Sequence, residues 1–394
     1  MTTTTRPRSP AHPAVRSAAR RATPRPPRPP AGTRSTGFVV LLAIIVVLNL
    51  IGLVMVLSAS TIVALDEYGS SWYYFKREVL WVALGTVAMV MALRVDYHRW
   101  RRLSGPFLVA AVALLVAVLV PRVGVSVNGA SRWLGAGPFQ LQPSELAKLA
   151  VLLFVADLLA RRSARLDDTR VTLRPVLAVL AVTAGLIMVQ PNLGTTIVLA
   201  AIVFGMLFAA GVPLGPLAGW GALGVGTALV AALGESYRRE RVLSFLNPWA
   251  DPLNTGYQTI QSQVSLASGG WLGVGLGASR AKWGFLPFAH TDFIFAIIGE
   301  ELGLVGAALV VGLFAGLGWL GMRTALRAPD ALGRLMATGI TTWICVQAFV
   351  NIGAVIGILP ITGVPLPFIS YGGSSTLATM AAAGVLLNIA RQGR

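Results

Sequence analysis

The chain has 394 residues, of which 55% are hydrophobic and only 12% are charged, and its mean hydropathy is +0.72. A soluble domain carries about 25% charged residues, so this composition excludes a soluble globular protein, and recurring runs of roughly 20 apolar residues indicate several membrane-spanning helices. The long runs also exclude a transmembrane β-barrel, which shows short alternating segments, and the single Cys345 excludes an intrachain disulfide.

A basic, proline-rich tail occupies residues 1–36. It contains eight arginines, eight prolines and no acidic residue, and because it has almost nothing apolar to bury we predict that it is disordered. It does not resemble a signal peptide, since the apolar run that starts near Gly37 is too long and has no small-residue cleavage site. The net charge of +17 therefore indicates a cytoplasmic topology anchor that contacts anionic lipids, and it does not indicate nucleic-acid binding.

A membrane domain over residues 37–394 follows the tail. We predict an all-α polytopic membrane protein with about ten transmembrane helices, because ten apolar segments can be counted. They cover residues 37–60, 78–93, 105–120, 144–160, 173–189, 193–210, 213–234, 291–322, 335–358 and 371–390. The eighth segment is longer than a span requires, which predicts a helix that is tilted or lies partly outside the membrane.

Arginines are concentrated in alternate connections between these segments. The connections at 94–102, 161–174 and 323–334 carry four, five and three arginines, and the last four residues carry two. By the positive-inside rule these connections and both termini lie in the cytoplasm. The other connections are then extracytoplasmic, and the largest of them is the loop at 235–290, between the seventh and eighth helices.

Several familiar site types are absent from the sequence. The stretch "GVGLG" (273–277) is rich in glycine, but no strand precedes it, so a phosphate-binding loop is not indicated. The three histidines lie in separate regions and Cys345 stands alone, which excludes a zinc site and a Cys–His pair. What remains is a set of carboxylates and cations on the predicted outer face.

The first candidate is Asp251, in the stretch "FLNPWADPLNTGYQ" (245–258). Pro252 restricts the backbone of Asp251 to extended geometry. In one interpretation Asp251 is a turn residue whose carboxylate binds its own backbone; in the other it is a functional carboxylate held on a stiff loop. The residues by themselves leave both interpretations open.

A second group lies in "NGASRWLGAGPFQLQPSELAK" (128–148). Glu145 and Lys148 are three residues apart at the start of a helix, so they share a face. In a structural interpretation Ser144 caps this helix, Glu145 lies at its positive end, and Arg132 is an interfacial arginine that points outward. In the functional interpretation Arg132 and Lys148 contact an anionic substrate.

The third group lies in "AHTDFIFAIIGEELG" (289–303). Thr291 and Asp292 could cap the eighth helix. Glu300 and Glu301 lie inside an apolar run, where a carboxylate is costly, so we expect a functional or network role for at least one of them. Lys282, in the preceding loop, could meet an anionic group nearby or be solvated.

The fourth group lies in "LPITGVPLPFISYGGSS" (359–375). Its prolines and its Gly-Gly-Ser-Ser run exclude one regular helix. Backbone donors of such a bend can hold an anion. The alternative is a tight re-entrant turn that leads into the last helix.

Together these stretches closely resemble the SEDS family (shape, elongation, division and sporulation), whose best-known members are FtsW and RodA. The resemblance runs from about residue 38 to 390 with order and spacing intact. The matching stretches are "GLVMVLSAS" (52–60), "NGASRWL" (128–134), "QPSELAKL" (142–149), "QPNLGT" (190–195), "NPWADPLNTGYQ" (247–258), "LPFAHTDFIFAIIGEELG" (286–303) and "LPITGVPLPFISYGGSS" (359–375).

The resemblance implies a ten-helix bundle in the bacterial cell membrane, with both ends in the cytoplasm. It implies a peptidoglycan glycosyltransferase that polymerises lipid II, releases undecaprenyl diphosphate and works beside a class B penicillin-binding protein and other membrane proteins of the division complex. The proposed catalytic aspartate of the family matches Asp251. The stretch "GLGASRAKWGFLPFAHTDF" (275–293) looks more like the division type, found at the septum, than the elongation type.

The reaction requires few groups, because a lipid diphosphate can leave without being protonated once its charge is neutralised. One base and a cluster of cations are then sufficient, and a bound Mg²⁺ or Mn²⁺ could share the neutralisation; no organic cofactor is implied. Asp251 is the expected base. The expected substrate-binding residues are Arg132, Glu145, Lys148, Lys282, His290, Asp292, Glu300, Ser370, Gly372 and Gly373.

One position departs from the family, which often has "QPDLGT" where this chain has "QPNLGT". Asn192 can still cap a helix after Pro191, but an acid–base role there becomes doubtful. Three alternatives stay open at this point: an elongation-type polymerase, a lipid II flippase and a scaffold that only recruits a transpeptidase.

Overall fold

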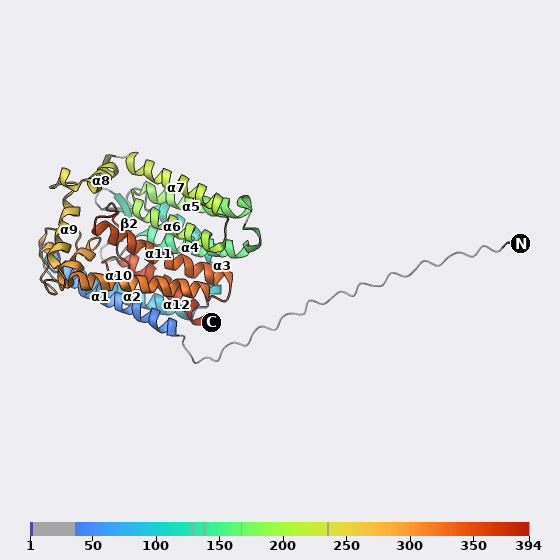
Figure 1. Ribbon diagram of the computed structural model, residues 1–394, viewed down its shortest axis with the longest axis horizontal. Coiled ribbons are helices and arrows are strands. Elements are labelled where there is room, and N and C mark those ends of the chain that lie inside the picture. The colour runs from blue at the N-terminus through green and yellow to red at the C-terminus, as the bar shows by residue number, and fades with distance from the viewer. Residues whose placement is uncertain (3–35, 128–129, 137–138, 167, 235, 394) are drawn as a thin grey trace. The chain divides into compact units, whose positions relative to one another are not determined.

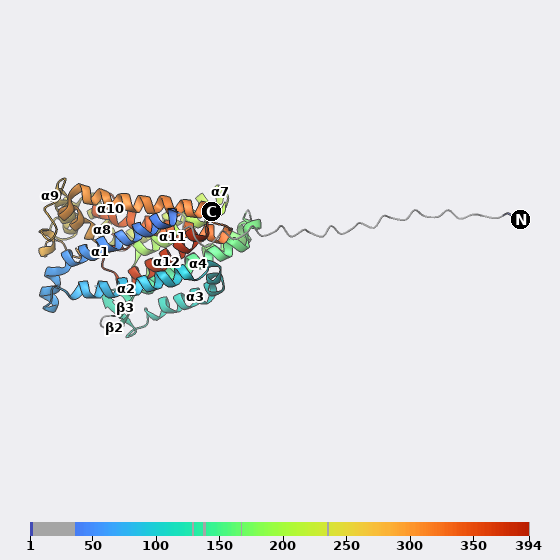
Figure 2. The same cartoon turned by 90° about the horizontal axis from the view of Figure 1, so that it is seen from below.

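The computed structural model describes residues 1–2, 36–127, 130–136, 139–166, 168–234 and 236–393. The predicted disorder of the tail over 1–36 falls almost entirely outside these residues. The described chain from residue 36 onward is a bundle of long helices (Figure 1). Figures 1 and 2 place α9 (Tyr257–Gly269) at one end of the bundle and the C-terminal end of α12 (Gly373–Gln392) at the other.

Each of the ten predicted apolar segments lies largely within one long helix. Besides α12, these long helices are α1 (Thr36–Tyr68), α2 (Tyr73–Arg94), α3 (Tyr97–Ala117), α4 (Pro143–Arg161), α5 (Arg174–Val189), α6 (Leu193–Ala210), α7 (Leu214–Gly234), α10 (Ile294–Leu326) and α11 (Ala331–Val355). In the described part of the chain, eight helices are long and apolar enough to cross a membrane, and α2 and α4 are not among them. The all-α polytopic prediction is confirmed, and the count of ten spans stays a prediction.

Helix ends test the capping predictions. The side chain of Asn192 accepts a hydrogen bond from the Thr195 N–H at 3.1 Å and caps α6, as predicted. Ser144 does not cap α4, because the helix begins at Pro143, so Ser144 lies within its first turn and Gln142 is the N-cap. Thr291 and Asp292 do not cap α10 either: both lie in a turn before the helix, and Phe293 is the N-cap.

A break at Gly303 divides α10 in two. The backbone of Gly303 is at φ 67° and ψ −167°, which is not helical, and the loop at 270–275 replaces the helical hydrogen bonds lost there. The replacements are Val274 N–H to Glu300 O, Gly275 N–H to Glu301 O, Leu304 N–H to Gly270 O and Val305 N–H to Trp271 O, at 2.9–3.2 Å. Residues 304–326 alone would extend for about 34 Å, which is enough to cross the membrane. The part of α10 before Gly303 is therefore not needed to span the membrane.

The connections contain secondary structure that we did not predict. A three-stranded antiparallel sheet, β1 (Gly124–Val127), β2 (Ala130–Ala136) and β3 (Phe139–Leu141), joins α3 to α4. The loop at 235–290 contains α8 (Ser236–Leu246), α9 and two short 3₁₀ turns, η3 (Pro248–Ala250) and η4 (Ala281–Trp283). These elements are short and rich in glycine and polar residues, so their periodicity is weak.

Candidate functional site

Asp251 lies directly after η3, in a turn that its own carboxylate closes. One carboxylate oxygen accepts from the Asn254 side chain at 3.1 Å, and the other accepts from the Thr255 N–H at 3.3 Å. These bonds, led by the Thr255 backbone N–H, hold the pKa of Asp251 below its usual range. The side chain is only partly covered and has no cationic partner among the described residues. The turn interpretation is therefore correct, and it leaves an ionised carboxylate facing solvent.

Gly256 fixes this turn from the other side. Its N–H donates to the Asp251 carbonyl at 2.9 Å, and a Cβ at this position would lie 1.9 Å from the Pro248 carbonyl oxygen. No side chain fits at such a distance. The glycine of "NPWADPLNTGYQ" thus allows the chain to fold back onto Pro248 and hold Asp251 in place.

Arg132 connects two motifs that are far apart in the sequence. From β2, its Nε donates to the Gln190 carbonyl at 2.8 Å and its Nη2 to the Pro191 carbonyl at 2.6 Å. These carbonyls form the corner between α5 and α6, which contains "QPNLGT". Arg132 therefore anchors the sheet to that corner, and the outward-pointing interpretation is wrong.

Glu145 and Lys148 form a buried ion pair at 2.9 Å, on the shared helix face that the sequence predicts. Lys148 also donates to Gln347 at 2.7 Å and lies 4.8 Å from the centre of the Trp343 ring. Its side chain is fully buried, so in this conformation it meets these partners and no substrate. One Glu145 oxygen has no hydrogen-bond partner among the described residues.

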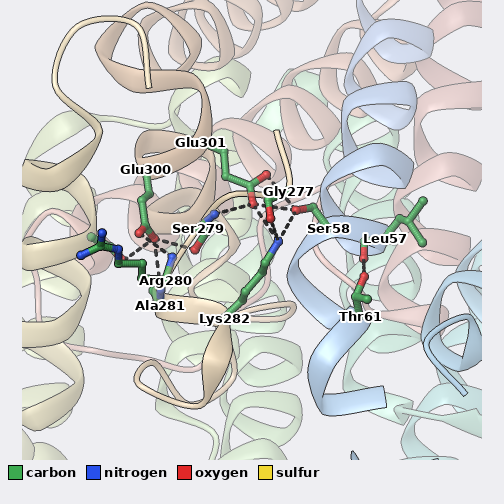
Figure 3. Close-up of polar contacts among 11 residues, drawn as sticks. Leu57, Ser58, Thr61, Gly277, Ser279, Arg280, Ala281, Lys282, Glu300 and Glu301 are labelled. Carbon is green, nitrogen blue, oxygen red and sulfur yellow. Dashed lines mark hydrogen bonds and ion pairs between the residues drawn. The ribbon is translucent and has the colours of Figure 1, made fainter. Parts of the chain in front are cut away.

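Glu300 binds the loop that precedes η4 (Figure 3). Its carboxylate accepts from the Ser279 hydroxyl at 2.6 Å and from the Arg280 N–H at 2.8 Å. Ser265 of α9 donates to it as well, at 3.1 Å. Both oxygens are therefore satisfied inside the protein, which supports a network role for this residue.

Glu301 pairs with a buried cation on the same loop. Lys282 Nζ lies 3.3 Å from Glu301 Oε1 and also donates to the Gly277 carbonyl. Ser58 of α1 donates to Glu301 at 2.7 Å (Figure 3). Lys282 and Glu301 thus join α1, α10 and the loop, and the interpretation of Lys282 as a solvated loop residue is wrong.

The stretch at 359–372 is a buried re-entrant segment, as one of the two predictions for it states. Leu366, Phe368 and Ile369 are buried, and Asn351 of α11 donates to the Val364 and Asp292 carbonyls at 2.8 Å. Non-helical backbone is tolerated at such a depth because protein, and not lipid, surrounds it.

Ser370 and His290 meet where this segment crosses the turn before α10. The Ser370 hydroxyl donates to the Thr291 carbonyl at 2.6 Å, and the Tyr371 N–H donates to the His290 carbonyl at 3.0 Å. The His290 ring lies against Tyr74, with ring centres 4.6 Å apart. Burial lowers the pKa of His290 to about 4, so the imidazole is neutral at pH 7.

One prediction for the backbone of Gly372 and Gly373 was that it holds an anion. In the structure, the N-terminus of α12 lies against a carboxylate of the protein itself, that of Glu78. Glu78 of α2 is buried and accepts from Thr376 at 3.3 Å. Gly373 lies against Trp81, whose ring would be 2.4 Å from a Cβ. Glu78 was not among the predicted residues, although a carboxylate at the start of the second apolar segment is a signal present in the sequence.

The predicted residues therefore fall into separate groups. The structure pairs Glu145 with Lys148 and Lys282 with Glu301, and it joins His290, Asp292 and Ser370 around the re-entrant segment. Asp251 stands apart from these pairs. In the described ranges, no group of three His, Cys, Asp or Glu residues is arranged to hold a metal ion.

The chain is similar to characterised proteins over nearly its whole length. The profile of the cell cycle protein family of FtsW, RodA and SpoVE matches residues 39–394. The chain is 41% identical over 350 residues to the probable peptidoglycan glycosyltransferase FtsW of Geobacter metallireducens, covering 89% of this chain and 93% of that protein. It is 43% identical over 355 residues to the stage V sporulation protein E of Bacillus subtilis, covering 90% and 97%.

Solved structures show the same fold. A chain from a structure described as the coordination of polymerization and crosslinking by a peptidoglycan synthase complex superposes with a TM-score of 0.72 at 31% identity, over 89% of this chain and 96% of that one. The rod shape determining protein RodA of Thermus thermophilus gives a TM-score of 0.66 at 29% identity, over 89% and 95%.

Proposed function

The chain belongs to the FtsW, RodA and SpoVE family of cell cycle proteins, and we propose that it is a peptidoglycan glycosyltransferase that polymerises lipid II during cell division. The relatives named FtsW, at about 40% identity, support the activity and the division branch. The observation that carries the mechanism is the stiff turn around Asp251, which presents an ionised carboxylate to solvent.

Asp251 is the general base in this proposal. It takes the proton from the 4-hydroxyl of one sugar as that oxygen attacks C1 of the other, while the undecaprenyl diphosphate leaves with the bonding electron pair. A carboxylate with a low pKa is ionised at neutral pH but is a weak base. Positioning of the two sugars and neutralisation of the leaving diphosphate must therefore supply much of the rate enhancement.

Two of the three candidate cations for the diphosphate are engaged in buried ion pairs. Lys148 and Lys282 are buried and paired, so in the described conformation they order the bundle. Arg132 is only partly buried and belongs to a connection outside the helices, so it is the cation that we assign to the diphosphate. Mg²⁺ typically binds one or two carboxylates plus substrate phosphates. Asp251 would supply the one carboxylate that such an ion needs, and the diphosphate would supply the phosphate oxygens.

The cellular setting follows from the same family. We propose that both termini lie in the cytoplasm, that the protein acts at the division septum, and that a class B penicillin-binding protein cross-links the strands it makes. A solved relative comes from a peptidoglycan synthase complex that couples polymerization to crosslinking, which supports a transpeptidase partner.

The test is polymerisation of purified lipid II by the purified chain, with and without the transpeptidase. The proposal predicts long strands that lysozyme digests. A flippase would form no polymer yet would move lipid II across liposomes, and a scaffold would do neither. Absence of strands with the partner present would reject the glycosyltransferase.

A further inference from the structure

A cavity of about 240 Å³ opens at the end of the bundle opposite α9, where three helices finish or begin. It lies between the first turn of α1, the last turns of α10 and the end of α12. The ends of these helices lie close together in Figure 1. The catalytic proposal does not use this cavity, because Asp251 is in the connection that contains α9.

Two arginines at the end of α10 supply the full positive charges of the cavity. Arg323 lies in the last turn of the helix, Arg327 follows the helix directly as its C-cap, and both line the cavity. Neither has a carboxylate partner among the described residues. Asp330, the acidic residue nearest to them in the sequence, is already bound to His98 and to the Gly333 N–H.

The other walls combine apolar side chains with helix ends of both signs, because the ends of α10 and α12 present carbonyls of partial negative charge beside Ala390 and Gly393. Phe38 and Leu320 are buried residues that line the cavity. Thr36 and Gly37, in the first turn of α1, also line it, and a helix N-terminus carries a partial positive charge from its unpaired N–H groups. The two full guanidinium charges exceed these partial charges, so the site combines a net positive rim with a hydrocarbon wall.

The depth of the cavity in the membrane follows from α10. Residues 304–326 span the hydrocarbon core by their length alone, so Arg323 and Arg327 lie where that core ends. Lipid headgroups occupy this level, and arginines there attract anionic lipids.

We propose that this cavity binds the phosphodiester headgroup of an anionic phospholipid, with the phosphate at Arg323 and Arg327 and the start of an acyl chain along Phe38 and Leu320. A zwitterionic lipid has the same phosphate but also a cationic group, which the two arginines repel. The bound lipid would join the ends of α1, α10 and α12. This site is independent of lipid II polymerisation.

Native mass spectrometry of the full chain in detergent tests the proposal, with phosphatidylglycerol and phosphatidylcholine titrated separately. We expect the wild type to bind one phosphatidylglycerol about tenfold more tightly than phosphatidylcholine, because each arginine near the headgroup contributes severalfold. Arg323→Gln/Arg327→Gln should remove that preference. The matched control Arg99→Gln/Arg102→Gln removes two exposed arginines of α3 from outside the cavity and should retain it.

Two further measurements separate the contributions of the cavity's shape and of the lipid headgroup from the contribution of charge. Thr36→Trp, at an exposed position that lines the cavity, should fill the space and weaken phosphatidylglycerol binding without changing charge. Inorganic phosphate at millimolar concentration should not displace the lipid. Full displacement of the lipid by phosphate would identify a site for soluble phosphate. An equal loss of the phosphatidylglycerol preference in the α3 control would mean that the preference depends only on net charge. Either result would overturn the proposal.

Discussion

The turn around Asp251 and the Glu300–Glu301 pair of α10 use carboxylates in opposite ways. Glu300 and Glu301 are buried, and their oxygens accept from serine hydroxyls, backbone N–H groups and Lys282. Among the described residues, Asp251 accepts only from Asn254 and Thr255 of its own turn, and it stays open to solvent. The Glu300–Glu301 pair holds helices and a loop together, whereas the turn leaves the carboxylate of Asp251 accessible to solvent.

Under the proposed mechanism, depth in the membrane does not identify the reactive carboxylate. A buried carboxylate is stable only where donors surround it, and the donors around Glu300 and Glu301 leave no acceptor for a substrate. The reacting sugars are polar, and the carboxylate that meets them must be reachable from water. Asp251 meets that condition, and the pair does not.

The largest effect on stability is expected from Glu301→Gln. The substitution leaves Lys282 buried without a carboxylate, and breaking a buried ion pair typically costs about 3–5 kcal/mol. We expect a clear fall in the thermal unfolding temperature in detergent, partly recovered by Glu301→Gln/Lys282→Met. Asp251→Asn is the matched control and should melt like the wild type; equal losses for the two single variants would contradict the comparison.

His290 should make stability depend on pH. Its pKa is about 4 in the folded protein and about 6.5 when unfolded, so below pH 6.5 the unfolded chain binds a proton that the folded chain does not. Stability should fall between pH 6.5 and 4, by roughly 3 kcal/mol at most, and this residue adds no further loss below pH 4. The difference between wild type and His290→Phe, measured by melting at each pH, isolates this residue; a difference that stays constant with pH would refute it.

Arg132→Ala should reduce polymerisation by about 10- to 100-fold, since hydrogen bonds from a charged group are worth about 1.5–3 kcal/mol. Arg132→Lys should recover only part, because a point charge cannot make both carbonyl contacts and bind a diphosphate. Turnover is measured alongside melting. A variant that loses stability but keeps its activity would leave Arg132 with the structural role alone.

The smallest effect is expected from Asn192→Ala, which removes the cap of α6. Loss of an N-cap typically costs about 1 kcal/mol, so the melting temperature should fall slightly. Asn192→Asp restores the acceptor and should match or exceed the wild type. Loss of activity in Asn192→Ala without a change in melting would point to a chemical role for this position.

The sequence was sufficient to predict the ten long helices, but not the short elements of the connections or the partner of each charged residue. Apolar runs predict the bundle because a span needs about 20 such residues, and the i, i+3 spacing predicts the shared face of Glu145 and Lys148. The partners of Arg132 and Lys282 come from segments far along the chain, which no local pattern encodes. The partner of Glu78, Thr376 of α12, is likewise 298 residues away, so the sequence signal at Glu78 did not reveal its contact.

The most direct measurement of the central claim is strand synthesis from lipid II by purified Asp251→Asn, with its partner present. The variant keeps the size and most hydrogen bonds of the turn but cannot accept a proton. Glu240→Gln, a nearby exposed carboxylate of α8, is the control. We predict that Asp251→Asn binds lipid II but makes at least about 100-fold less glycan, the lower range of a general base, while the control stays active. Near wild-type synthesis by Asp251→Asn would contradict the account.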